Sequence, residues 1–110
     1  MVVTFELDGT AFMALNGGPT YRLTPAVSFV VNCKDQAEVD YYWDRLGAGG
    51  RDVQCGWLVD KFGVSWQVVP DRLGELMSDP DPARADRTMQ AMLKMVKLDV
   101  AALEAAADSR

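Results

Sequence analysis

The chain has 110 residues, of which 49% are hydrophobic and 25% charged, and its formal net charge is −5 at pH 7. A chain of this length forms one domain with a modest core. Its 11 basic residues are scattered singly among 16 acidic ones, which excludes a nucleic-acid surface because phosphate binding requires clustered Lys and Arg. No apolar stretch approaches the roughly 20 residues that span a bilayer, and the N-terminus lacks the pattern of a signal peptide. We therefore expect a cytoplasmic protein with neither a nucleic-acid nor a membrane partner.

The two cysteines, Cys33 and Cys55, lie far apart in a chain that contains no histidine. A disulfide framework would require more cysteines, and a zinc site would require closer spacing or a histidine. We expect both cysteines to be small buried hydrophobic residues in a reducing cytoplasm. The lack of histidine also excludes the Ser/His/Asp and Cys/His arrangements of nucleophilic catalysis.

The first elements in chain order are two β-like runs, residues 2–7 (VVTFEL) and 11–15 (AFMAL), separated by Asp8-Gly9-Thr10. Asp-Gly between two such runs predicts a hairpin, because both residues tolerate positive φ. The segment Asn16-Gly17-Gly18-Pro19 ends the second strand.

The middle of the chain is predicted to run strand, helix, strand, strand. Residues 26–32 are rich in β-branched side chains, and Asp35 with Glu38 has the spacing of a capping box at a helix start. One apolar stripe follows the helix, made of Val39, Tyr42, Trp43 and Leu46. Residues 53–59 and 64–69 then form a second hairpin around a turn at 60–63.

Three helices are predicted after Pro70. Asp71 is placed to cap a short helix, and the turn at 78–83 places a proline for the next helix start. The second helix is predicted to bury one stripe, consisting of Met89, Met92, Leu93 and Val96. Asp99 caps a last, Ala-rich helix that extends to about residue 107.

A family resemblance is carried by five stretches: residues 5–19, 26–33, 38–46, 55–70 and 78–106. The most specific of them is the block CGWLVDKFGVSWQVVP at 55–70. The chain resembles the PhnB-like branch of the glyoxalase/bleomycin-resistance/dioxygenase (vicinal oxygen chelate) superfamily. Members of this branch are also described as 3-demethylubiquinone-9 3-methyltransferase-like.

The resemblance implies an α+β fold, with a βαβββ module preceded by a β-hairpin from a partial first module and followed by C-terminal helices. Residues 1–110 would then form a single glyoxalase-like domain, divided into the partial module at 1–18, the complete module at 24–70 and the helices at 71–110. Relatives have a further strand, helix and strand before the hairpin. We therefore expect either a start internal to a longer gene or a shortened natural form.

The hairpin at 2–15 is expected to lack its usual helix cover and strand neighbour. An open sheet edge with an apolar face tends to pair with another chain. The sequence therefore predicts a homodimer, in one form with elements exchanged between the two copies.

Strand alternation predicts which side chains form a site. Val64, Trp66 and Val68 should face the helix, so Ser28, Ser65 and Gln67 should face the other way. The resemblance implies that this second face is the inside of a ligand-binding cup. Gln67 then either binds a ligand or hydrogen-bonds to Ser28 and the backbone. Two further residues complete the candidate ligand-binding set, namely Trp57 as pocket wall or partner contact and Asn16.

The residue types in this predicted site disfavour the binding of a metal ion. In metal-binding relatives a Glu stands where Gln67 lies and a His near Ser28. First-row divalent metals prefer imidazole, thiolate or carboxylate ligands. We therefore expect neither a cofactor nor a catalytic divalent metal.

Three functions stay open on the sequence alone. The first is a dimeric protein that binds a small organic ligand without a metal. The second is a metal-dependent lyase, isomerase or dioxygenase-type enzyme on a vicinal-oxygen substrate, with ligands supplied by a partner chain or a missing N-terminal segment. The third is a role in assembly only. The sequence does not decide whether any reaction is catalysed.

Overall fold

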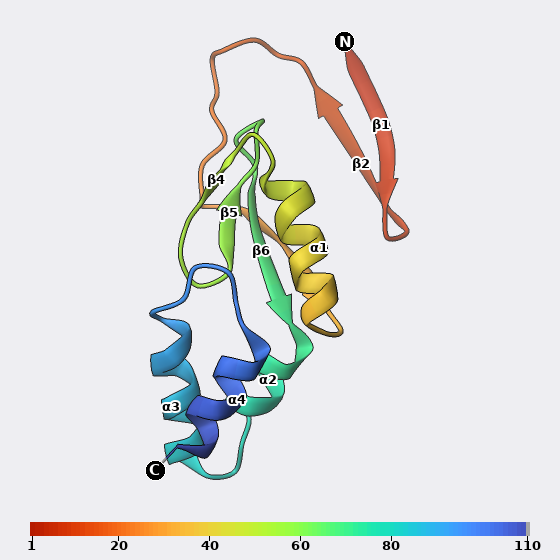
Figure 1. The fold of residues 1–110 in the computed structure, drawn as a ribbon. Helices are drawn as coiled ribbons and strands as arrows, with labels where there is room; N and C mark the ends of the chain where they lie inside the picture. The colour runs from red at the N-terminus through yellow and green to blue at the C-terminus, as the bar shows by residue number, and fades with distance from the viewer. Residues whose placement is uncertain (110) are drawn as a thin grey trace.

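The computed structural model describes residues 1–109 and has an α+β fold with two sheets and four helices. The elements are β1 (Val2–Leu7), β2 (Thr10–Leu15), β3 (Ser28–Cys33), α1 (Gln36–Gly47), β4 (Arg51–Asp52), β5 (Trp57–Val59), β6 (Ser65–Pro70), α2 (Asp71–Met77), α3 (Pro82–Met92) and α4 (Val100–Asp108). The molecule is elongated, with extents of 55, 26 and 22 Å. The β1–β2 hairpin lies at one end and helices α2–α4 lie at the other (Figure 1).

The β1–β2 hairpin is a separate two-stranded sheet. Its register runs from Val2 opposite Leu15 to Leu7 opposite Thr10, so the loop is the dipeptide Asp8-Gly9 alone. Both loop residues have positive φ, 49° and 79°, as a two-residue turn matched to strand twist requires. The predicted hairpin is confirmed, although Thr10 belongs to the second strand instead of the turn.

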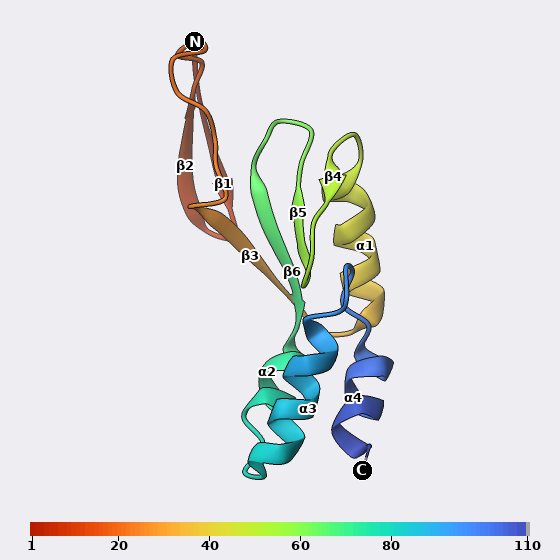
Figure 2. The same ribbon diagram turned by 90° about the vertical axis from the view of Figure 1, so that its left-hand side faces the viewer.

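The larger sheet has the strand order β3-β6-β5-β4. Strands β3 and β6 pair in parallel through a crossover that contains α1, and β5 pairs antiparallel with both β6 and β4. This β3-α1-β4-β5-β6 unit is the predicted βαβββ module. Figure 2 shows the hairpin beyond the β3 edge of this sheet and α1 toward the opposite side.

The prediction of one continuous strand over residues 53–59 is wrong. Strand β4 ends at Asp52, and β5 begins only at Trp57. Between them Cys55 and Gly56 have φ values of 59° and 84°, which leave the extended region. Their N–H groups donate to the carbonyls of Met95 and Val96, each at 2.8 Å. The break in the strand therefore ties the sheet to the segment that leads into α4.

Helix α1 covers one face of the sheet and closes the main core. Asp35 caps the helix by accepting a hydrogen bond from the Glu38 N–H at 2.9 Å, and the Glu38 carboxylate accepts one from the Lys34 N–H, so the predicted N-cap is confirmed. The buried residues of this core come from four elements: Cys33, Val39, Trp43, Leu58 and Val68. The predicted helix stripe also holds, since Tyr42 and Leu46 pack against this cluster.

Helices α2, α3 and α4 form a second lobe around buried Leu76, Leu103 and Ala107. Asp71 is the first helical residue instead of the cap, because Pro70 occupies the cap position. The predicted starts of α3, at Pro82 behind Asp81, and of α4, behind Asp99, are confirmed.

The predicted buried stripe of α3 is only partly correct. Met92 packs against the second core, but Met89, Leu93 and Val96 are 40%, 49% and 43% exposed. The helix ends at Met92, so Leu93 and Val96 do not continue its periodicity. Thr88 is the buried residue of this helix.

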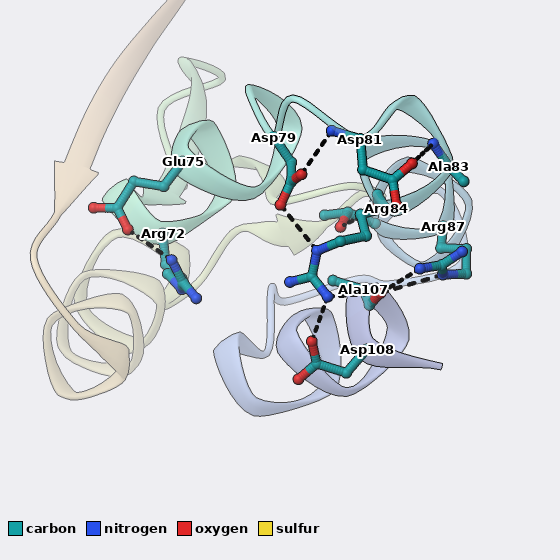
Figure 3. Close-up of polar contacts among 10 residues, drawn as sticks. Arg72, Glu75, Asp79, Asp81, Ala83, Arg84, Arg87, Ala107 and Asp108 are labelled. Carbon is teal, nitrogen blue, oxygen red and sulfur yellow. Dashed lines mark hydrogen bonds and ion pairs between the residues drawn. The ribbon is translucent and has the colours of Figure 1, made fainter. Parts of the chain in front are cut away.

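Two arginines of α3 hold the end of α4 (Figure 3). Arg87 donates from Nε and Nη2 to the Ala107 carbonyl, at 3.2 and 2.7 Å. Arg84 binds Asp79 at 2.9 Å and Asp108 at 2.6 Å. Cationic groups at a helix C-terminus satisfy its last carbonyls and complement the helix dipole, so these contacts fix α4 against α3.

The helical lobe is also joined to the first turn of α1. Gln36 donates from Nε2 to the Leu98 carbonyl at 3.0 Å and accepts at Oε1 from the Val100 N–H at 2.7 Å. Lys97 and Asp40 form an ion pair at 2.9 Å. The start of α4 is therefore positioned by the same helix that covers the sheet.

Substituting Gly56 tests the junction between the two lobes. A Cβ on Gly56 would lie 3.0 Å from Leu98 Cδ1 and 3.0 Å from the Val68 carbonyl oxygen, at a φ of +84°. We expect Gly56→Ala to lower the free energy of unfolding by roughly 2–4 kcal/mol, from backbone strain and overpacking together. Urea unfolding at pH 7 measures the change.

The matched control is Gly74→Ala in α2, where a Cβ meets nothing within 4 Å. Alanine is the better helix former by about 1 kcal/mol, so this variant should be slightly more stable than the wild type. Equal, small effects at the two positions would contradict the close approach at Gly56.

Candidate functional site

The candidate site is the face of the large sheet opposite α1. Val31, Trp66 and Val68 pack with the core under α1, so their sequence neighbours on β3 and β6 face the other side. Ser28 and Gln67 lie on this second face, and Trp57 shares it because Trp57 is paired with Gln67 across β5 and β6. All three side chains are half-buried. Ser65 is paired with Ser28 and shares this face. The structure therefore brings four of the five predicted site residues onto one face.

A hydrogen bond joins the two polar residues of this face. Gln67 donates from Nε2 to the Ser28 Oγ at 2.9 Å. The register places Gln67 beside Val30, with Ser28 one row away on the same face, so the amide reaches diagonally across the parallel pair. A carboxamide has two donor hydrogens and two acceptor lone pairs. One bond to Ser28 therefore uses only part of its capacity.

Ser65 and Asn16 differ from these three residues in their surroundings. Ser65 lies on the open face at the start of β6, paired with Ser28, but it is only 2% exposed. It borders a separate small cavity of about 220 Å³ between the sheet and the segment that includes Arg22 and Leu23. Asn16 lies at the open end of the hairpin, where its N–H donates to the Met1 carbonyl at 3.0 Å. Asn16 is thus on the hairpin and not on the large sheet.

Arg51 is a residue of this face that the sequence analysis missed. It is paired with Val59, which is paired in turn with Ser65, and paired residues lie on the same face. Its side chain is exposed. The predicted strand began at residue 53, so the two-residue strand β4 was overlooked. Exposed Val30 and Asn32 complete the β3 row of the face.

Comparison with known proteins identifies the family. The family model described as 3-demethylubiquinone-9 3-methyltransferase matches residues 1–69, which cover the hairpin and nearly the whole βαβββ unit. The chain belongs to this family. The resemblance to PhnB-like proteins is thereby confirmed.

A solved structure supports the same assignment. It is described as a putative 3-demethylubiquinone-9 3-methyltransferase, a PhnB protein from Bacillus cereus, and is 32% identical with a TM-score of 0.59. The match covers 64% of this chain and 64% of that one. No curated protein matches the chain. Within residues 1–109, no helix has the length and apolar character needed to cross a membrane.

The donor set of this family member fits a transition metal poorly. The polar side chains on the open face carry hydroxyl, amide and guanidinium groups: Ser28, Ser65, Gln67, Asn32 and Arg51. First-row divalent metals instead bind imidazole, thiolate or carboxylate. Across residues 1–109, no group of three His, Cys, Asp or Glu side chains converges as a metal site would require. We therefore derive no chemical step through a metal.

The two thiols differ in their surroundings. Cys33 is 0% exposed, and its Sγ donates to the Val31 carbonyl at 3.7 Å. Burial, with smaller contributions from the carboxylates of Glu38, Asp71 and Asp35, raises the pKa of the Cys33 thiol to about 11. Cys55 is only half-buried, so the expectation of two buried cysteines is correct for Cys33 and only partly correct for Cys55.

The pKa of Cys33 predicts a loss of stability at alkaline pH. The folded-state value of about 11 lies above the ordinary 9.0, so the folded chain holds this proton more tightly than the unfolded chain. The stabilisation is complete below pH 9 and is lost as the pH rises through 11. Between pH 8 and pH 10 the wild type should lose about 1 kcal/mol more than Cys33→Ala in urea unfolding. A wild-type-minus-variant difference that stays constant with pH would contradict this.

Proposed function

We propose that this family member is a dimeric protein that binds a small organic ligand on the open face of the large sheet, without a functional metal. The observation that carries the proposal is the group formed by Gln67, Ser28 and Trp57 on a face that α1 does not cover. The amide of Gln67 has hydrogen-bonding capacity left over and can orient a ligand together with the Ser28 hydroxyl. The Trp57 side chain offers apolar contact to the same ligand. These are the components of a small-molecule site.

The hairpin supports the dimeric part of the proposal. Eleven of its twelve strand residues are exposed, including Val3, Phe5, Met13 and Leu15. A two-stranded hairpin is at best marginally stable by itself in water, and unpaired strand edges favour pairing with another chain. A second copy that covers this hairpin would remove both exposed apolar surface and free edges.

A thermal-shift screen against a panel of neutral and anionic metabolites tests ligand binding. At least one compound should raise the melting temperature of the wild type by several degrees, because a ligand that binds only the folded state stabilises it. Gln67→Leu should lose most of that shift, since it removes the amide and keeps a side chain of similar size. Gln90→Leu, on the exposed surface of α3, should keep it.

Light scattering and metal analysis on the same samples test the rest. We expect the mass of two chains at micromolar concentration and no stoichiometric metal. An equal shift in the wild type and Gln67→Leu, or a panel that stabilises neither, contradicts the site. A well-folded monomer contradicts the dimer, and stoichiometric Zn, Ni, Mn or Fe favours a metal-dependent enzyme instead.

A further inference from the structure

A second concave region lies away from the open face, between the tip of the hairpin, the free edge of β3 and helix α1. It is an open groove of about 670 Å³, in the size range of small-molecule sites. Four aromatic side chains from four different elements line it: Phe12, Phe29, Tyr42 and Trp66. Val30 and Asn32 border the groove at the β3 edge, but neither Gln67 nor Ser28 nor Trp57 lines it. The groove is therefore distinct from the site around Gln67.

The aromatic side chains of the groove form a connected series. The ring centroids of Phe12 and Phe29 are 5.7 Å apart, and those of Phe29 and Trp66 are 5.4 Å apart. Phe5 stacks on Phe12 from the neighbouring strand at 5.6 Å. These contacts join the hairpin to the large sheet, so they also set the width of the groove.

Asp8 is the one charged side chain among the residues that line the groove. Its position is fixed by the hairpin turn, in which Asp8 has a φ of 49°. A carboxylate at the end of an otherwise uncharged aromatic groove attracts a cation, and aromatic faces attract it further through their quadrupoles.

The hydrogen bond of the Trp66 indole strengthens its attraction for a cation. The indole Nε1 donates to the Asp60 Oδ2 at 2.9 Å. A hydrogen bond from the indole N–H to a carboxylate polarises the ring and makes its faces more negative. Tryptophan already gives the strongest cation–π contacts among the aromatic residues.

We propose that this groove binds an organic cation that carries an apolar or aromatic group, such as a substituted quaternary ammonium. The carboxylate of Asp8 complements the charge, and the rings from Phe12 to Trp66 hold the apolar part. The proposal does not depend on the ligand of the open face, since none of Ser28, Trp57 and Gln67 lines the groove.

Titration with benzyltrimethylammonium chloride at constant ionic strength, followed by two-dimensional amide NMR, tests the proposal. We expect saturable shifts at the amides of residues 29–32 and Tyr42 and at the Trp66 indole N–H. Benzyl alcohol, which carries the same ring without the charge, should bind at least threefold more weakly.

Two variants test the role of the carboxylate. Asp8→Asn should weaken binding of the cation about three- to tenfold, and it keeps the turn because Asn-Gly is a favoured hairpin loop. Glu6→Gln removes an equal charge two residues earlier in β1, on the hairpin face opposite Phe12, and it should leave binding unchanged.

Four results would overturn the proposal. The first three are the absence of saturable shifts, equal affinity for benzyl alcohol, and equal weakening by Asp8→Asn and Glu6→Gln. The fourth is a change of the groove's amide signals with protein concentration alone and not with the cation, because a second copy of the chain would then occupy the groove.

Discussion

The parallel pairing of β3 with β6 is the contact on which the rest of the structure depends. Six residue pairs join the two strands, from Ser28 with Ser65 to Cys33 with Pro70. Parallel strands require a crossover connection, and here the crossover contains α1, which covers one face of the pair. Val68 and Val39 become buried between sheet and helix. The other face is left with Gln67 bonded to Ser28, so the candidate site is a direct consequence of this pairing.

The same pairing explains how the chain accommodates two lobes. Strand β6 leads directly into α2, while the break at Cys55 and Gly56 receives the segment before α4. The Val68 N–H donates to the Gly56 carbonyl at 2.8 Å, so the strand that carries Gln67 is also bonded to the junction. Changes at the junction should therefore affect the open face as well as stability.

Much of the large sheet and its helix could be predicted from the sequence, because in these elements the local sequence pattern agrees with the burial of the side chains. Alternation correctly placed Val68 under the helix and Gln67 on the opposite face, and the capping residue Asp35 marked the start of α1. Cys55 was misplaced because a non-glycine residue in the left-handed region gives no warning in the sequence. Asn16 was grouped with Gln67 only by resemblance, and long-range placement of a hairpin does not follow from strand periodicity.

The groove beside the hairpin escaped prediction for the same reason. Strand alternation placed Trp66 toward the helix, and nothing in the sequence pattern indicated that Phe12 and Phe29 would lie beside it. Only the tertiary arrangement brings their rings into one series and sets Asp8 at its end. The family to which the chain belongs therefore accounts for the fold, while the chemistry of both sites rests on particular side chains of this member.

Native-state hydrogen exchange of the protected amides of β3 tests the central role of the β3–β6 pairing. Strand β3 lies at the edge of the large sheet, and its six residues pair only with β6. The free energy of opening measured there should equal the free energy of global unfolding, because a pairing on which the whole fold depends opens only with complete unfolding. An opening free energy well below the global value, or below that of the β1–β2 hairpin, would contradict the account.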